Sequence, residues 1–127
     1  MNRRLWVLMT GLVFTAAACA HHHTDEPSPI TAPGLVEVTN NYGLPMEVFA
    51  VGTSTRQRLG LVNPGMVSRF EIPANLINGG AVVFQAIPTA PVHSQQYRSG
   101  ELFLNSGTVV ELVIAAVLFN STATIRP

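Results

Sequence analysis

Three adjacent histidines, His21, His22 and His23, are the side chains of this sequence best suited to bind a metal, and Asp25 and Glu26 follow closely. Imidazole and carboxylate groups are ligands for Cu, Ni and Zn. Consecutive residues in an extended segment hold no fixed coordination geometry, so the pattern predicts weak and unselective metal binding. We expect the run to serve mainly as a polar spacer, and we predict no cofactor.

One further histidine, His93, is available for acid–base chemistry. Nucleophilic catalysis would need it beside a serine and an orienting acid, and Ser94, Ser99 and Glu101 are its neighbours only along the chain. The residues after position 34 include no Asp, Cys or Lys. This inventory predicts a protein that is not an enzyme, with His93 as a solvated loop residue.

The segment around His93 suggests recognition instead. His93, Gln95, Gln96 and Tyr97 place imidazole, amide and phenol groups between two expected strands. Binding residues often lie on loops that a rigid scaffold holds in place. These four residues are therefore the candidate recognition loop.

The only cysteine, Cys19, ends an apolar N-terminal leader. Arg3 and Arg4 precede an apolar run over residues 5–14, and small residues follow over 15–20, which is the pattern of a secretory signal. The run is shorter than the roughly 20 residues that a membrane-spanning helix needs. We therefore predict a signal peptide over residues 1–18.

The residues Ala16-Ala17-Ala18 and Cys19 resemble the lipobox of bacterial lipoproteins, although the first lipobox position is usually Leu. The resemblance implies that the Cys19 sulfur carries a diacylglycerol, and that cleavage before it frees an amine for a further acyl chain such as palmitate. It also implies anchoring in a cell-envelope membrane. Ala20, in place of Asp, favours the outer membrane by the same resemblance, where the organism has one.

A second cleavage site gives an alternative. Ordinary signal peptidase could cut after Ala20 and leave His21 as a free terminus, so that its amine and imidazole, with His23, would chelate copper. That terminus resembles the terminal histidine of small copper-binding β-sandwich proteins of the periplasm. We favour lipid attachment because it gives the lone cysteine a use in an exported protein.

Composition predicts one folded domain. The chain has 127 residues, of which 47% are hydrophobic and 11% charged, which excludes a disordered polyelectrolyte. Without the leader, five arginines stand against seven acidic residues, so no basic field remains for binding nucleic acid. Pro27, Pro29 and Pro33 predict an extended tether over residues 19–34, ahead of a domain over 35–127.

Short β-rich runs separated by Asn, Gly and Pro turns fill that domain. The expected strands cover residues 35–40, 46–52, 56–62, 67–72, 81–87, 98–104 and 108–115, with a last short strand near 122–126. The apolar run 108–119 is rich in β-branched residues and predicts a central strand that turns near Ala115 and Ala116. Seven or eight strands predict a single all-β fold, an Ig-like or transthyretin-like antiparallel β-sandwich.

The turn at residues 63–66 predicts a hairpin with a definite register. In that register Arg58 faces Glu71 in a surface ion pair, and Leu59 faces Phe70, so that polar and apolar pairs lie on opposite faces of the sheet.

The same stretch, from Arg58 to Pro73, resembles small uncharacterised β-sandwich lipoproteins of high-GC bacteria, which share the pattern R-L-G-x-V, turn, F-x-[LI]-P. The likeness covers about residues 35–115. It implies the fold and transfers no activity, because that group has no catalytic motif to carry over.

Overall fold

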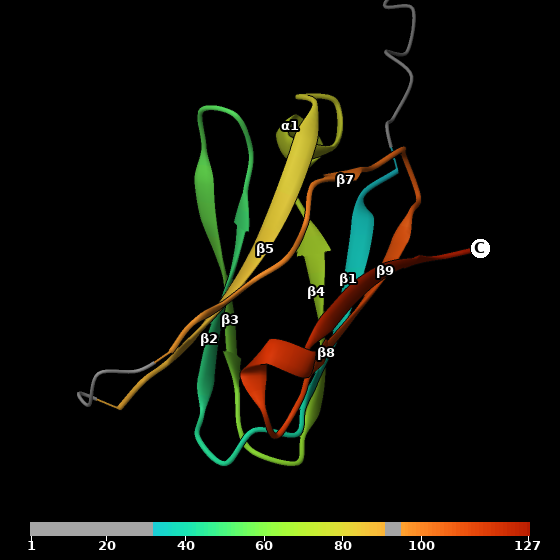
Figure 1. The fold of residues 1–127 in the computed structure, drawn as a ribbon. Helices are drawn as coiled ribbons and strands as arrows, with labels where there is room; N and C mark the ends of the chain where they lie inside the picture. The colour runs from blue at the N-terminus through green and yellow to red at the C-terminus, as the bar shows by residue number, and fades with distance from the viewer. Residues whose placement is uncertain (1–31, 91–94) are drawn as a thin grey trace, which may run out of the picture.

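Two β-sheets packed face to face form the domain, as a computed structural model shows for residues 32–90 and 95–127 (Figure 1). The first sheet has the strand order β4-β1-β8-β9; the second has β3-β2-β5-β6, with β7 also paired to β5. The elements in chain order are β1 (Gly34–Asn40), β2 (Met46–Val51), β3 (Arg56–Val62), β4 (Val67–Ile72), α1 (Ala74–Ile77), β5 (Ala81–Pro88), β6 (Tyr97–Arg98), β7 (Leu102–Phe103), β8 (Val109–Ile114), the 3-10 turn η1 (Leu118–Asn120) and β9 (Thr122–Arg126). The predicted all-β sandwich is confirmed.

Alternation along the central strands creates the core between the sheets. Every second residue of β1, β2 and β8 is buried, because successive side chains of a strand point to opposite faces. The fully buried side chains include Val36, Val38, Met46, Val48, Ile72, Phe84, Val110, Leu112 and Ile114. No helix among the described residues is long and apolar enough to cross a membrane.

The first sheet is mixed, which corrects the prediction of a purely antiparallel sandwich. β1 pairs with β4 in the antiparallel sense and with β8 in the parallel sense. A short turn forces two consecutive strands to run antiparallel, whereas β1 and β8 are far apart in the chain and can pair in the parallel sense. Both strands present aliphatic residues to the core. The described residues also form nine strands, where seven or eight were expected.

The predicted hairpin between β3 and β4 is wrong, because these strands belong to different sheets. Arg58 lies opposite Phe49 of β2 and pairs with Glu47, with a nitrogen–oxygen distance of 3.1 Å. Glu71 lies opposite Leu35 of β1. The turn at residues 63–66 carries the chain from the second sheet to the first.

The strand expected at residues 98–104 is divided into two short pieces, β6 and β7. Both pair with β5, and Ser99 lies between them. The Ser99 hydroxyl accepts a hydrogen bond from the Phe84 amide at 2.8 Å and donates one to the Gly100 carbonyl at 2.8 Å. A side chain thus replaces part of the strand ladder there, which strand propensity alone does not reveal. The turn after β8 is confirmed, since β8 ends at Ile114.

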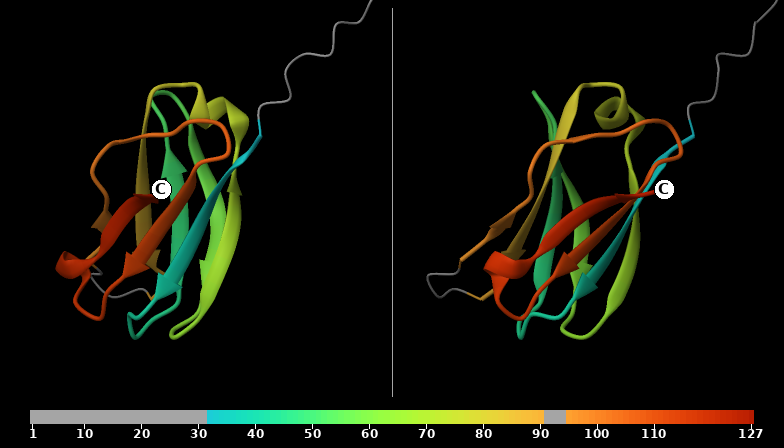
Figure 2. Two further views of the ribbon diagram at one scale, coloured as in Figure 1. Left: turned by 90° about the vertical axis from the view of Figure 1, so that its right-hand side faces the viewer. Right: turned by 45° about the vertical axis from the view of Figure 1, so that its right-hand side comes forward.

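The two ends of the sandwich consist of different connections (Figure 2). One end, which we call the near end, contains the start of β1, the β2–β3 turn and α1. The chain enters there, where the Ala32 carbonyl accepts hydrogen bonds from the Gly107 amide and the Ser106 hydroxyl. The opposite end, which we call the far end, consists of the connections at residues 41–45, 63–66 and 115–121, with residues 89–90 and 95–96 beside them.

Candidate functional site

An open groove of about 600 Å³ lies at the far end, between β6 and η1. One wall comes from the predicted recognition loop and the other from the connection between β8 and β9. The lining residues are Gln95, Gln96, Tyr97, Arg98, Leu118 and Phe119.

Strand pairing positions the first wall. Tyr97 lies opposite Ala86 of β5, which is an inward position, and its ring packs against the core. Arg98 lies opposite Gln85 and is exposed on the outer face of the second sheet. Burial raises the pKa of the Tyr97 phenol, so at neutral pH this group is an uncharged hydrogen-bonding partner.

A tight turn positions the second wall. Leu118 is buried and anchors η1, while the Ser121 hydroxyl accepts a hydrogen bond from the Ala115 amide at 2.9 Å. With the turn fixed in this way, Phe119 projects outward and is 94% exposed, and Val117 beside it is 61% exposed. An aromatic side chain held in water by a rigid turn is a contact residue available to a partner.

The groove offers contact chemistry. Its lining combines aromatic rings, two amides and a guanidinium, and the described lining residues include no carboxylate, thiol, imidazole or aliphatic hydroxyl. Such a set can bind through apolar contact and hydrogen bonds. Among residues 32–90 and 95–127, no group of three or more His, Cys, Asp or Glu side chains could hold a metal.

The predicted site residues divide into three groups. Gln95, Gln96 and Tyr97 are brought together in the groove. Ser99 is buried, with its hydroxyl engaged in both directions by the backbone. The predictions for lipidation and metal binding, at Cys19, His21, His22 and His23, and for recognition at His93 lie outside the described residues.

Sequence reasoning missed Arg98, Leu118 and Phe119. In the sequence the run 108–119 is one apolar stretch, and nothing local connects its end with the segment around Tyr97. A signal was present in the sequence, because Phe119 follows the turn at Ala115 and precedes the polar pair Asn120-Ser121.

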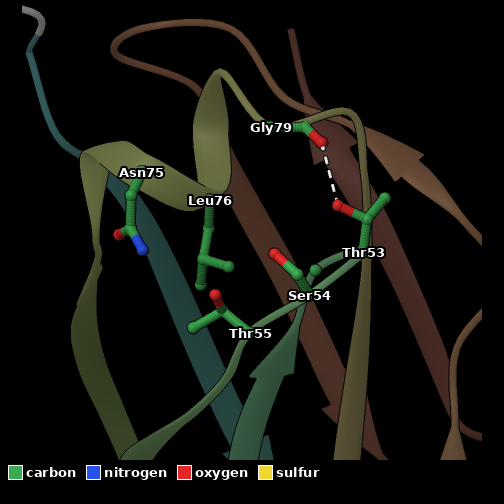
Figure 3. Close-up of a pocket in the computed structure, with 7 residues that line it drawn as sticks. Thr53, Ser54, Thr55, Asn75, Leu76 and Gly79 are labelled. Atoms are coloured by element: carbon green, nitrogen blue, oxygen red, sulfur yellow. Dashed lines mark hydrogen bonds between the residues drawn. The ribbon is translucent and has the colours of Figure 1, made fainter.

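A smaller pocket at the near end is lined by polar side chains together with Leu76 and two glycines (Figure 3). The β2–β3 turn presents Thr53, Ser54 and Thr55 toward α1, and the Thr53 hydroxyl donates a 3.4 Å hydrogen bond to the Gly79 carbonyl. The pocket volume is about 50 Å³, which suits one or two water molecules. It is too small for an organic ligand.

A third hollow, of about 150 Å³, lies on the outer face of the first sheet beside an ion-pair cluster. The Arg69 guanidinium contacts Glu37 at 2.7 Å, and the Arg126 guanidinium contacts Glu37 at 3.2 Å and Glu111 at 2.9 Å. Hydrogen bonds from Arg69 and Arg126 hold the pKa of Glu37 below its ordinary value. The four charges neutralise one another, which indicates a structural role for this cluster.

Comparison with known proteins places no family on this chain. No family model and no curated protein matches it. Among solved structures it is similar to the NMR structure of a protein from Eubacterium rectale, with 10% identity and a TM-score of 0.44 over 77% of this chain and 92% of that one.

Proposed function

We propose that the protein is a lipid-anchored lipoprotein of the cell envelope, in the outer membrane where the organism has one, and that its sandwich is a non-catalytic binding module. The lipobox-like sequence before Cys19 supports the anchor. The far-end groove, with the exposed Phe119 ring, supports the binding role and is the observation that carries it.

The position of the groove agrees with this proposal. The chain enters the sandwich at the near end, and the turn η1, which borders the groove, lies at the opposite end (Figure 1). Because the tether joins the near end, the groove is clear of the attachment point and can contact components of the envelope, lipid included. Surfaces used for binding often carry exposed aromatic side chains of this kind.

The anchor is tested by intact-mass spectrometry of the protein purified from membranes. The expected mass is that of a chain beginning at Cys19 with diacylglycerol and a further acyl chain attached. An unmodified chain beginning at His21 would overturn the anchor and would favour the copper-binding alternative.

The binding role is tested with a photoreactive side chain. Benzoylphenylalanine at position 119 should crosslink to a component of native membranes, and the same group at position 103 should not. Phe103 is a matched control because it is also exposed, at 69%, and lies in β7 toward the near end. Equal crosslinking from both positions, or none from position 119, would overturn the groove as the binding surface.

A further inference from the structure

Charge is distributed unevenly between the strands and the far end. The described residues contain five arginines and five glutamates, and all lie in strands except Glu101, which lies between β6 and β7. The far-end connections at residues 41–45, 63–66 and 115–121, together with 89–90 and 95–96, contain no charged residue. The far-end connections are therefore free of ionic groups, and Arg98 of β6 is the one charged residue that lines the groove beside them.

Apolar side chains are concentrated at this same end. Six of the nine large hydrophobic residues that are exposed in the described chain lie in these connections or within two residues of them, namely Leu44, Leu61, Met66, Val67, Val117 and Phe119. They come from three separate connections, and only Phe119 lines the groove. The apolar surface is thus broader than the groove and is spread over several tips.

One buried side chain holds these connections together. The Asn40 amide is fully buried and donates hydrogen bonds to the carbonyls of Leu44 and Val62, both at 2.9 Å, while its oxygen accepts one from the Tyr42 amide. The Asn40 carbonyl accepts a further bond from Gly65. Because part of the backbone polarity of the end is satisfied internally, contact with an apolar medium leaves fewer groups unpaired.

We propose that the far end docks on the interface of the lipid bilayer that holds the protein's own anchor, a step that rests on the proposed function. Transfer of apolar side chains from water into the headgroup boundary is favourable, and the far-end connections carry no charge that would oppose it. Tyr97 at the edge of the groove has the amphipathic character of residues found at membrane interfaces.

The reach of the tether permits this contact. Residues 19–32 span at most about 50 Å when extended, whereas the eight residues of β5 span only about 26 Å along the sandwich. The domain can therefore turn its far end toward the bilayer that anchors it. Tethering also raises the effective lipid concentration, so that a weak contact is populated.

Tryptophan fluorescence tests the proposal directly. Trp6, the only tryptophan of the chain, lies in the leader, so Phe119→Trp and Phe103→Trp each give the mature lipoprotein one reporter. Both proteins are reconstituted into vesicles of zwitterionic phosphatidylcholine with brominated acyl chains. The reporter at position 119 should be blue-shifted and quenched at least about twofold relative to unbrominated vesicles, and the reporter at position 103 should not; the difference should persist at high salt.

Two further arms make the result specific. Leu44→Ser with Met66→Ser, in the Phe119→Trp protein, should reduce the quenching while the thermal unfolding midpoint shows that the fold is kept. Brominated lipid confined to added vesicles without protein should leave the reporter at position 119 unquenched, because the contact is with the anchoring bilayer.

Several results would overturn the inference. Equal quenching at both positions, or no quenching at position 119, would show that the far end does not contact lipid selectively. Quenching that requires anionic lipid and disappears with salt would indicate an ionic contact. Quenching from added vesicles only, or a spectral shift at position 119 seen only when native membrane proteins are present, would exclude the anchoring bilayer as the docking surface. Vesicle flotation distinguishes failure of the docking from failure of the anchor, because a chain without lipid does not float. If the chain does not float, the unlipidated protein is mixed with the same brominated vesicles, and selective quenching of the Phe119→Trp reporter still decides whether the far end contacts lipid.

Discussion

Glu37 and Glu111 lie directly opposite each other on the parallel strands β1 and β8, a pairing of like charges that weakens a sheet unless it is compensated. Arg126 compensates it by contacting both carboxylates, and Arg69 contacts Glu37 from the other side. The same contacts raise the pKa of Arg126. The ion pairs on this face therefore offset the repulsion between the two opposed carboxylates.

This cluster predicts a pH dependence of stability. The pKa of Glu37 is lowered by hydrogen bonds from Arg69 and Arg126, so its stabilising contribution is present above the unfolded value of about 4.3 and is lost as pH falls through the lower folded pKa. Glu37→Gln should lower the urea midpoint at pH 6, and the difference from wild type should shrink toward pH 3. Glu101→Gln, at an exposed position with no ion pair among the described residues, is the control. A constant difference across this range would contradict the assignment.

Asn40 carries the second prediction at the level of single residues. Asn40→Ala removes the amide that bonds the carbonyls of Leu44 and Val62, at a cost of roughly 1–3 kcal/mol in the free energy of unfolding. Urea denaturation measures the loss, and Asn120→Ala, at an exposed position, should change stability by less than about 0.5 kcal/mol. Equal effects of the two substitutions would show that the buried network contributes little.

At the scale of elements, β3 and β4 approach each other across the core from different sheets, which predicts a steric effect of substitutions at Gly60 that a hairpin of these two strands would not predict. A side chain at Gly60 would place its Cβ 2.5 Å from the Phe70 ring, which lies over this glycine from the other sheet. Gly60→Ala should destabilise the protein by about 1–3 kcal/mol. Adding Phe70→Leu should recover part of that loss, so that the two changes together cost less than their sum in a double-mutant cycle. Simple additivity would contradict the contact.

The same two strands show what the sequence could and could not predict. The bounds of β3 and β4 agree with the expected runs 56–62 and 67–72, because alternation and turn residues are local properties. The partner of each strand is not a local property. The expected register of Arg58 with Glu71 places polar pairs on one face of a sheet and apolar pairs on the other, and yet the chain crosses between the sheets at residues 63–66. Gln95, Gln96 and Tyr97 line one groove with Phe119, and the sequence does not indicate that neighbour because η1 joins the groove only through the fold.

At the scale of the whole molecule, the separation of the two ends determines what the tether allows. The chain enters at the near end, and the connections that carry the groove and the exposed apolar side chains lie at the far end (Figure 2). For the far end to face its own bilayer, the tether must extend along the length of the sandwich. Under the proposed anchoring, the length of the tether should therefore control docking without altering any residue of the domain.

Deleting residues 24–31 tests this relation. The remaining tether reaches at most about 21 Å, which is shorter than the roughly 26 Å span of β5. Quenching of the Phe119→Trp reporter by brominated lipid in the anchoring vesicle should then fall to the level of the Phe103→Trp reporter, while flotation and the urea midpoint stay unchanged. Replacing the same eight positions with Gly and Ser keeps the reach and should keep the quenching. Persistent quenching after the deletion would mean that the far end meets lipid without turning back toward its anchor.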